Sequence, residues 1–431
     1  MSVFSKKSVS KIEIIDETFR EAIERSVVPV SLEDKMPILL KMVDAGIKKF
    51  FMGIGPSDMD LLRRCVDLQK LGSIPNDVRF VYIVLLNTWE HTKAKFEKNF
   101  SRDELNQLVF SFGMLDLDSK NDLFSRVLDE YEAIGMDRRI ARVSILNSFS
   151  LNGSKDQENI EDILRQVQYC LKNDISTIRI NDSTGKLNPD STVKLFTLLN
   201  KEFPQVGFGL HTHNDNGLSL INALKSIEGG CTIVEGSLAG FGNRAGITDL
   251  YLLVKILKDL EYNIGNIDLQ LLKEATLEAE KAFMLVPSVY RPGSGLYEKN
   301  VTTGVLNIPD YLDDSTVGRT YAISADSLHP KTIINALKIA EAPEEMIIFA
   351  SHSDEFMSTL LNGVEFLFKE KSAAQKVQYQ QWYAEMINMY ESNAVFPRDI
   401  LQVAQLLITE SLTAGDGGDN AYYFMGGLKY V

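Results

Sequence analysis

Short apolar, β-branched runs alternate with longer amphipathic segments from residue 11 to about residue 260. Each run is followed by a helical pattern, such as Leu32–Ala45 after the first and Leu218–Glu228 after the seventh. Alternation of this kind predicts repeated βα units with a parallel sheet. The expected strands are Ile12–Ile15, Lys49–Ile54, Arg79–Leu86, Gln107–Phe112, Ile140–Leu146, Thr177–Asn181, Gly207–His211 and Thr232–Gly236.

The number of units selects one fold class. Eight βα units in roughly 250 residues match a (β/α)8 TIM barrel in number and in length. The main alternative is a doubly wound open sheet, which usually has fewer strands, and no GxGxxG phosphate loop opens the first predicted helix. We therefore expect an α/β protein, a TIM barrel followed by a mainly helical C-terminal domain.

The alternation of strand and helix patterns ends at about residue 285. Val286-Pro287 and Arg291-Pro292-Gly293 follow, and such residues interrupt helices and strands. We expect a catalytic barrel over residues 1–285, a linker and small subdomain over 286–345, and a helical C-terminal subdomain over 346–431. Residues 353–412 have apolar positions at threes and fours and are interpreted as several helices. Such a tail is typical of a docking or dimerisation module.

Composition and charge limit the classes of binding partner and the cellular compartment that we expect. The chain has 431 residues, 45% of them hydrophobic, so its hydrophobic cores need no disulfide bonds for stability. A net charge of -14 without a basic run argues against nucleic acid and anionic membranes. The three cysteines have no CxxC spacing, the N-terminus lacks the apolar core of a secretory signal, and no stretch approaches the ~18 apolar residues of a membrane span. We expect a cytoplasmic protein.

Two of only five histidines, His211 and His213, leave the end of one predicted strand. Residues i and i+2 of a strand point to one face, where two imidazoles suit a divalent metal, although an ordinary hydrogen-bonded pair has the same spacing. In a barrel, the polar residues after the strands meet at the carboxyl end. They include Arg20 and Glu21 after the first strand and Ser183 and Thr184 after the sixth.

Several segments carry a family resemblance. They are DETFRE at 16–21, NDSTGKLNP at 181–189, HTHNDNG at 211–217, GFGNRAGIT at 240–248 and VGRTYAISADSLHPKTI at 317–333. Together they resemble the isopropylmalate synthase and homocitrate synthase family, over about residues 10 to 335. The same barrel superfamily includes hydroxymethylglutaryl-CoA lyase and some aldolases. The match in the second domain favours a synthase.

The resemblance implies a Claisen-type condensation of an acyl-CoA, acetyl-CoA above all, with a 2-oxo acid at a divalent metal, Mg, Mn or Zn. Glu21, His211 and His213 match the metal ligands. Arg20 matches the cation at the developing negative charge, and Ser183 and Thr184 match the substrate-binding segment. His329 matches a histidine that assists proton transfer, commonly from the partner subunit, so the resemblance also implies a homodimer. A place in amino-acid biosynthesis follows in the same way.

Other positions bear on the substrate. Glu21 together with Ile247-Thr248 resembles the homocitrate synthase branch. The family's Gly-Glu-Gln is replaced by Ala22-Ile23-Glu24, its Gly-Glu-Arg has Asn243, and residues 147–153 carry neither the expected glutamate nor an arginine. Standard 2-oxoglutarate chemistry is therefore in question. Glu24 or Glu90 is a candidate to supply the missing carboxylate.

Three functions follow from these observations. The leading hypothesis is a metal-dependent acyl-CoA:2-oxo acid synthase. A lyase or aldolase that cleaves a carbon–carbon bond on the same barrel is the alternative. The third is a barrel that has lost catalysis and serves as a binding protein.

Overall fold

The computed structural model describes residues 11–26, 29–55, 59–113, 115, 122–147, 156–285, 291–292, 300–303, 320–323 and 328–413. These residues form two compact units, divided within the segments 300–303 and 320–323. The first unit holds the residues up to Thr302, and the second holds those from Ile323 onwards. The three-part division with boundaries at 285 and 345 stays a prediction.

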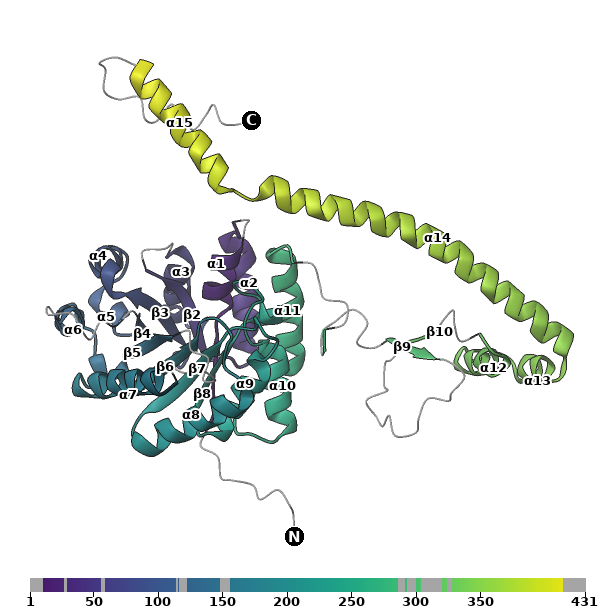
Figure 1. Cartoon of the computed structure of the whole chain (residues 1–431), viewed down its shortest axis with the longest axis horizontal. Coiled ribbons are helices and arrows are strands. Elements are labelled where there is room, and N and C mark those ends of the chain that lie inside the picture. Colours follow the sequence, from purple (N-terminus) through teal and green to yellow (C-terminus); the bar gives the residue numbers. More distant parts are fainter. Residues whose placement is uncertain are drawn as a thin grey trace, which may run out of the picture. The chain divides into compact units, whose positions relative to one another are not determined.

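The first unit is a closed barrel of eight parallel strands in the order of the sequence (Figure 1). The strands are β1 Glu13–Asp16, β2 Lys49–Ile54, β3 Arg79–Leu85, β4 Leu108–Gly113, β5 Arg142–Asn147, β6 Thr177–Asp182, β7 Gly207–Thr212 and β8 Ile233–Gly236. Pairing of Ile14 with Val234 joins the first strand to the last and closes the ring. The predicted TIM barrel is confirmed, and every expected strand is present.

One strand begins later than expected. The sequence pattern starts the fifth strand at Ile140, but Arg138–Ile140 forms a 3-10 turn and β5 begins at Arg142. The carboxylate of Asp137 accepts the backbone N–H of Arg139 at 2.9 Å and so favours the turn over an extended chain.

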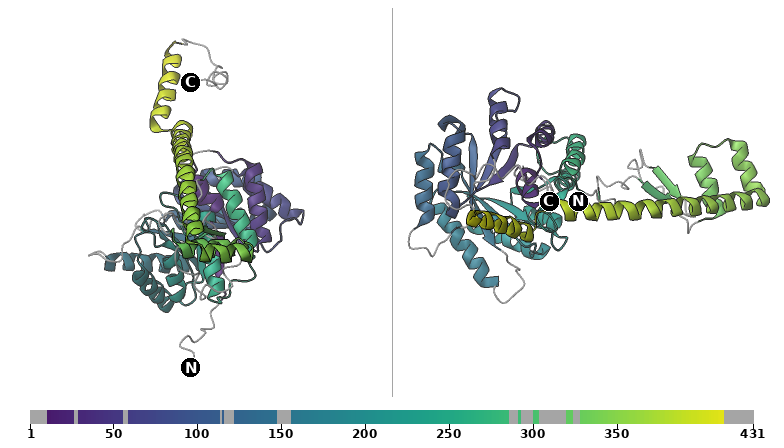
Figure 2. Two further views of the ribbon diagram at one scale, coloured as in Figure 1. Left: turned by 90° about the vertical axis from the view of Figure 1, so that its right-hand side faces the viewer. Right: turned by 90° about the horizontal axis from the view of Figure 1, so that it is seen from above.

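Helices surround the strands, as the right-hand view of Figure 2 shows. Several of them follow a polar residue whose side chain accepts a backbone N–H three residues on, among them Ser31, Asn188 and Asp249. The helical segments of the barrel unit are Thr18–Ala22 (a π-helical turn), α1 Ile23–Arg25, α2 Leu32–Asp44, α3 Asp60–Lys70, Leu86–Thr88 (3-10), α4 Trp89–Asn99, α5 Arg102–Leu105, α6 Leu123–Ala133, α7 Asp156–Lys172, α8 Pro189–Glu202, α9 Ser219–Glu228, Leu238–Gly240 (3-10), α10 Leu250–Asp259 and α11 Leu269–Ala282.

The barrel has an apolar core between strands and helices and a second apolar cluster inside the ring. The inner cluster is Ile15, Phe51, Val81, Ile83, Val109 and Ile233. Along β8, Ile233 is followed two residues later by the buried Glu235. Because alternate residues of a strand share a face, the interior changes from apolar to charged toward the carboxyl ends of the strands.

The second unit is mainly helical, as expected. Its helices are α12 Pro330–Ile339, α13 Glu344–His352, α14 Asp354–Asn393 and α15 Pro397–Thr413. The strands β9 Asn300–Thr303 and β10 Thr320–Ile323 pair with each other and belong mostly to the first unit. Ile333, Ala350 and Met357 form a small core among the first three helices. The expected several short helices of the tail are instead one helix of 40 residues and a second that starts at Pro397. Among the described residues, no helix has the length and apolar character needed to span a bilayer.

Candidate metal centre

Three side chains converge at the carboxyl end of the barrel from two segments that lie on either side of β8. His211 lies in β7, His213 lies just beyond its end, and Glu21 lies in the turn after β1. The Nε2 atoms of His211 and His213 are 3.4 Å apart, and Nε2 of His213 is 3.8 Å from Oε1 of Glu21. All three side chains are buried, and one potential ligand atom from each lies within 4.8 Å of the others. The structure thus brings together the three residues that the sequence predicted as ligands.

Glu21 is held in place from two sides. Its Oε2 lies 2.5 Å from Nη1 of Arg20, and its Oε1 accepts the backbone N–H of Asn243 at 2.9 Å. The loop after β8 approaches this closely because residue 242 is glycine. A Cβ on Gly242 would lie 2.6 Å from Cγ of Glu21. Asn243 stands where the resembled family has a glutamate. Its backbone N–H nevertheless donates to Glu21, the predicted metal ligand.

The protonation states suit a cation. Burial lowers the pKa of His211 well below that of a free imidazole, with the charge of Arg179 acting in the same direction. Burial also lowers the pKa of His213. For Glu21, burial opposes ionisation, but the charge of Arg20 and the backbone N–H of Asn243 favour it, and its pKa lies below the ordinary value. Two neutral imidazoles and one carboxylate are a nitrogen and oxygen ligand set that a divalent metal takes.

Arg20 is a buried cation. Its Nε lies 2.7 Å from Oε2 of Glu17, while Nη1 contacts Glu21 and lies 3.7 Å from Glu24. Burial disfavours its charged form, but the adjacent carboxylates raise its pKa and keep it charged. Arg20 is therefore not part of a surface salt bridge. Its Nη2 is buried without a hydrogen-bond partner in the described part of the chain and is free to donate to a bound molecule.

Ser183 and Thr184 lie in the loop after β6, beside the histidine segment. A Cβ on Gly185 would lie 2.8 Å from the carbonyl oxygen of His213, so the two loops are in close contact. Arg244 fastens them: its Nη2 donates to the carbonyl oxygen of Ser183 at 2.6 Å, and its Nε donates to Asp215 at 2.8 Å. Three loops, after β6, β7 and β8, are joined at the barrel mouth.

The other candidates differ in position. Glu24 is near Arg20, and its carboxylate accepts from Nδ2 of Asn243 at 3.4 Å. Glu90 is exposed in the first turn of α4. His329 belongs to the second unit, where its Nδ1 accepts the backbone N–H of Lys331 at the start of α12. Its part in proton transfer stays a prediction, as do the roles of both glutamates. Residues 148–153 lie outside the described residues.

Sequence reasoning missed a buried charged layer inside the barrel. Glu17, Arg142, Arg179 and Glu235 are all buried there, and Arg179 is ion-paired with both glutamates. The sequence held a signal for it. Arg142, Arg179 and Glu235 are charged residues within strands that are otherwise apolar, and such strands are buried on both faces in a parallel barrel.

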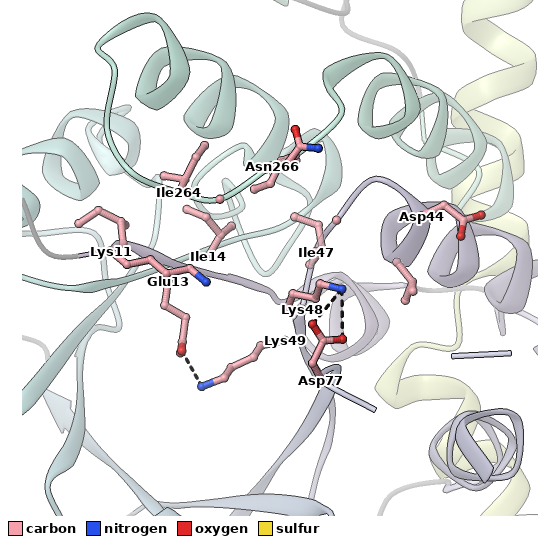
Figure 3. Close-up of a pocket in the computed structure, with 15 residues that line it drawn as sticks. Lys11, Glu13, Ile14, Asp44, Ile47, Lys48, Lys49, Asp77, Ile264 and Asn266 are labelled. Atoms are coloured by element: carbon pink, nitrogen blue, oxygen red, sulfur yellow. Dashed lines mark hydrogen bonds and ion pairs between the residues drawn. The ribbon is translucent and has the colours of Figure 1, made fainter. Parts of the chain in front are cut away.

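A pocket of about 650 Å³ opens at the opposite end of the barrel (Figure 3). Its lining includes Glu13 and Lys49, the first residues of β1 and β2. Lys49 pairs with Glu13 at 2.6 Å, and Lys48 pairs with Asp77 at 3.2 Å, so these lysines are already neutralised. TIM barrels place their chemistry at the carboxyl ends of the strands, and the metal-ligand set lies there.

The chain is similar to known proteins over most of its length. The HMGL-like family model matches residues 11–277. A homocitrate synthase of Sulfolobus acidocaldarius is 28% identical over 337 residues, which cover 73% of this chain and 68% of the relative. A homocitrate synthase of Saccharolobus islandicus is 27% identical over 366 residues, which cover 78% and 75%.

Solved structures support the fold. The structure of an HMG-CoA lyase from Acinetobacter baumannii in complex with coenzyme A and 3-methylmalate is similar with a TM-score of 0.50 at 17% identity, over 64% of this chain and 92% of the lyase. This likeness confirms the barrel architecture.

Proposed function

Since this chain belongs to the HMGL-like family, we propose that it condenses an acyl-CoA with a 2-oxo acid at a divalent metal and releases CoA. The proposal rests on two observations taken together, the identity of the relatives and the chemistry of the site. The relatives that match about three quarters of the chain are homocitrate synthases, and the site presents a carboxylate, two neutral imidazoles and an arginine at one mouth.

The reaction makes one carbon–carbon bond and breaks one thioester. A proton leaves the methyl group of the acyl-CoA, and the resulting carbanion attacks the keto carbon of the 2-oxo acid. The keto oxygen takes a proton and becomes a hydroxyl group, and water then cleaves the thioester to a carboxylate and free CoA thiol. A metal held by Glu21, His211 and His213 would supply Lewis acidity toward the keto oxygen.

Side chains of the protein are assigned to stabilising negative charge, binding the substrate and transferring protons. We assign to Arg20 the stabilisation of negative charge that develops on oxygen, because its Nη2 is an unpaired buried donor beside the ligands. Ser183 and Thr184 are assigned to the substrate carboxylate. The hydroxyl of Thr184 is buried and has no partner within the described residues, as expected of a group that meets a bound molecule. His329 is assigned to proton transfer.

The alternative is carbon–carbon cleavage on the same barrel. The absence of glutamate from residues 147–153 favours it, because the synthases resembled by this chain carry one there.

A free-thiol assay separates the two reactions. Metal-loaded protein is incubated with acetyl-CoA and each member of a panel of 2-oxo acids, with and without EDTA. Condensation releases CoA thiol only when an oxo acid is present, and EDTA abolishes the release. Cleavage instead produces a carbonyl product from a 3-hydroxyacyl-CoA or a hydroxy-oxo acid. A protein that shows neither activity, and binds neither metal nor oxo acid by calorimetry, would be a non-catalytic barrel.

We also propose a homodimer in the cytoplasm, acting in amino-acid biosynthesis. Large apolar side chains are exposed along α14 and α15, among them Phe366, Trp382 and Leu407. Burial of such side chains is a usual reason for association. The three cysteines are free and buried, as is usual for proteins of reducing compartments. Sedimentation velocity at several protein concentrations tests the dimer.

A further inference from the structure

The second ring nitrogen of His211 lies inside the barrel. Its Nδ1 is buried and has no hydrogen-bond partner in the described part of the chain. The nearest acceptors are Oε2 of Glu235, at 3.4 Å, and Oε1 of Glu17, at 3.6 Å. An imidazole that binds a metal through one nitrogen usually donates its other N–H to a carboxylate or carbonyl oxygen. One of these two glutamates is therefore in position to orient His211.

Glu235 is itself rigidly held. Its Oε2 accepts from Nε of Arg179 at 2.7 Å, and its Oε1 accepts from Nη2 of Arg142 at 3.1 Å. Both guanidinium groups lie over the ring of Phe51, at 4.7 Å and 5.3 Å from its centroid. A carboxylate bound by two guanidinium groups that lie on one aromatic face is held in a single position.

Gly209 lies beside this arrangement. It lies in β7 two residues before His211, so it shares the inner face of the strand. A Cβ at this position would be close to Cβ of Ile233, at 3.3 Å, and in ordinary van der Waals contact with Nη2 of Arg142, at 3.5 Å. The side chain of Arg142 therefore passes directly over the backbone of β7 on its way from β5 to Glu235 in β8.

Glu17 is oriented toward a different partner. Its Oε2 accepts from Nε of Arg20 at 2.7 Å, and its Oε1 pairs with Nη2 of Arg179. Both oxygens of Glu17 bind a guanidinium, as those of Glu235 do, but Oε1 of Glu17 is the more distant acceptor from His211. Glu17 therefore fixes Arg20, and Glu235 is the nearer acceptor for the imidazole.

We propose that Glu235 is a positioning residue of the metal site, which accepts the Nδ1–H of His211 and so presents Nε2 to the metal. The proposal rests on the proposed function, because it needs a metal at Glu21, His211 and His213. Nε2 is also the atom that faces His213, at 3.4 Å. The tautomer that Glu235 selects is thus the one that completes the ligand set.

A metal held by Glu17, His211 and Glu235 is the competing explanation. One potential ligand atom from each of these residues also lies within 4.8 Å of the others. Both carboxylates are, however, already neutralised by Arg179, and Glu235 by Arg142 as well. A divalent ion there would face two buried guanidinium groups at close range, which opposes its binding.

The test compares Glu235→Gln with the wild-type protein and with the control Glu280→Gln. Glu280 is also a buried glutamate paired with an arginine, Arg291, but it lies in α11 outside the site. Each protein is stripped with EDTA, and Zn²⁺ or Mn²⁺ is titrated by calorimetry. We expect one ion per wild-type chain, a dissociation constant raised about 10- to 100-fold in Glu235→Gln, and a wild-type constant in Glu280→Gln. Melting temperatures of the metal-free proteins reveal any general loss of stability.

Long-range ¹H–¹⁵N NMR of the imidazoles gives a readout that needs no variant. With five histidines in the chain, few ring signals need assignment. We expect His211 of the wild type to carry its proton on Nδ1. A proton on Nε2, an unchanged dissociation constant in Glu235→Gln, or a second bound ion that Glu235→Gln removes would overturn the proposal. Failure of the wild type to bind any ion would overturn the proposed function, whereas equal binding by wild type and Glu235→Gln refutes only the role of Glu235.

Discussion

The backbone N–H of Asn243 donates a 2.9 Å hydrogen bond to Oε1 of Glu21, which joins the loop after β8 to the turn after β1. The two residues are 222 positions apart in the sequence and meet because β8 pairs with β1 when the barrel closes. The proposed ligand from the turn after the first strand is therefore oriented by the last loop, so the candidate metal site depends on closure of the whole ring.

Gly242→Ala should weaken metal binding without unfolding the protein. The new Cβ would lie 2.6 Å from Cγ of Glu21 and would displace the carboxylate. We expect a dissociation constant about 10-fold higher by calorimetry, the lower end of the effect of disturbing groups that orient a ligand. Gly207→Ala in β7 is the control, because the nearest atom to its Cβ is 3.8 Å away. Equal affinity in the two variants would refute the role of Gly242.

His213→Ala should abolish stoichiometric metal binding. It removes one of the three ligands while the barrel core stays intact. Metal content after dialysis, measured by plasma mass spectrometry, should fall from one ion per chain to a small fraction. His91→Ala is the control, since His91 is exposed on α4. Retention of a full equivalent in His213→Ala would mean that the metal binds elsewhere.

Arg20→Lys should slow turnover and leave the metal in place. Lysine keeps the positive charge beside Glu17 and Glu21 but loses the planar fork that contacts both of them. We expect kcat for CoA release to fall about 10²- to 10³-fold, the size of losing one oxyanion donor. Arg63→Lys, in an ion pair with Glu104 on the outside of the barrel, should leave kcat unchanged. A parallel loss of metal from Arg20→Lys would assign Arg20 to metal retention instead.

Metal affinity should resist mild acidification. The pKa values of His211 and His213 are lowered by burial, so both imidazoles stay neutral at a pH where a free imidazole, with a pKa of 6.5, is protonated. Protons therefore begin to compete with the metal only below about pH 6.5. Dissociation constants measured across this range should stay constant down to that pH and rise below it. A rise that already begins near pH 7 would indicate solvent-accessible histidines.

Asp16→Asn should stabilise the protein increasingly as pH rises. Burial raises the pKa of Asp16 from 3.8 to about 8, so between these values the carboxyl group is protonated when folded and ionised when unfolded. The unfolded state binds fewer protons, so the contribution of Asp16 to stability falls as pH rises from about 4 to about 8. Asparagine is neutral throughout. The melting temperature of Asp16→Asn, measured by calorimetry, should exceed that of the wild type by an amount that grows from about pH 4 to about pH 8. The control Asp77→Asn, at an exposed position, should show no such trend. A constant offset would contradict the raised pKa.

The sequence by itself determined the barrel, and it predicted which residues would be metal ligands. Strand runs such as Thr177–Asn181 recur at the spacing of βα units because each strand must bury both faces, and that requirement is local to the chain. His211 and His213 share a face because the side-chain period of a strand is two. Glu21 was added to them because the segment 16–21 resembles a family motif. Its place at the mouth of the barrel follows from the order of the strands.

Only the tertiary structure decided what holds those ligands. Glu235 and His211 are neighbours because β7 and β8 pair in one register, and a shift of one residue would put the two side chains on opposite faces of the sheet. Gly242 matters through atoms of Glu21, far away in the chain, which no spacing reveals. The charges of Arg142, Arg179, Glu17 and Glu235 balance only when the ring closes around them, so their pairing is a property of packing.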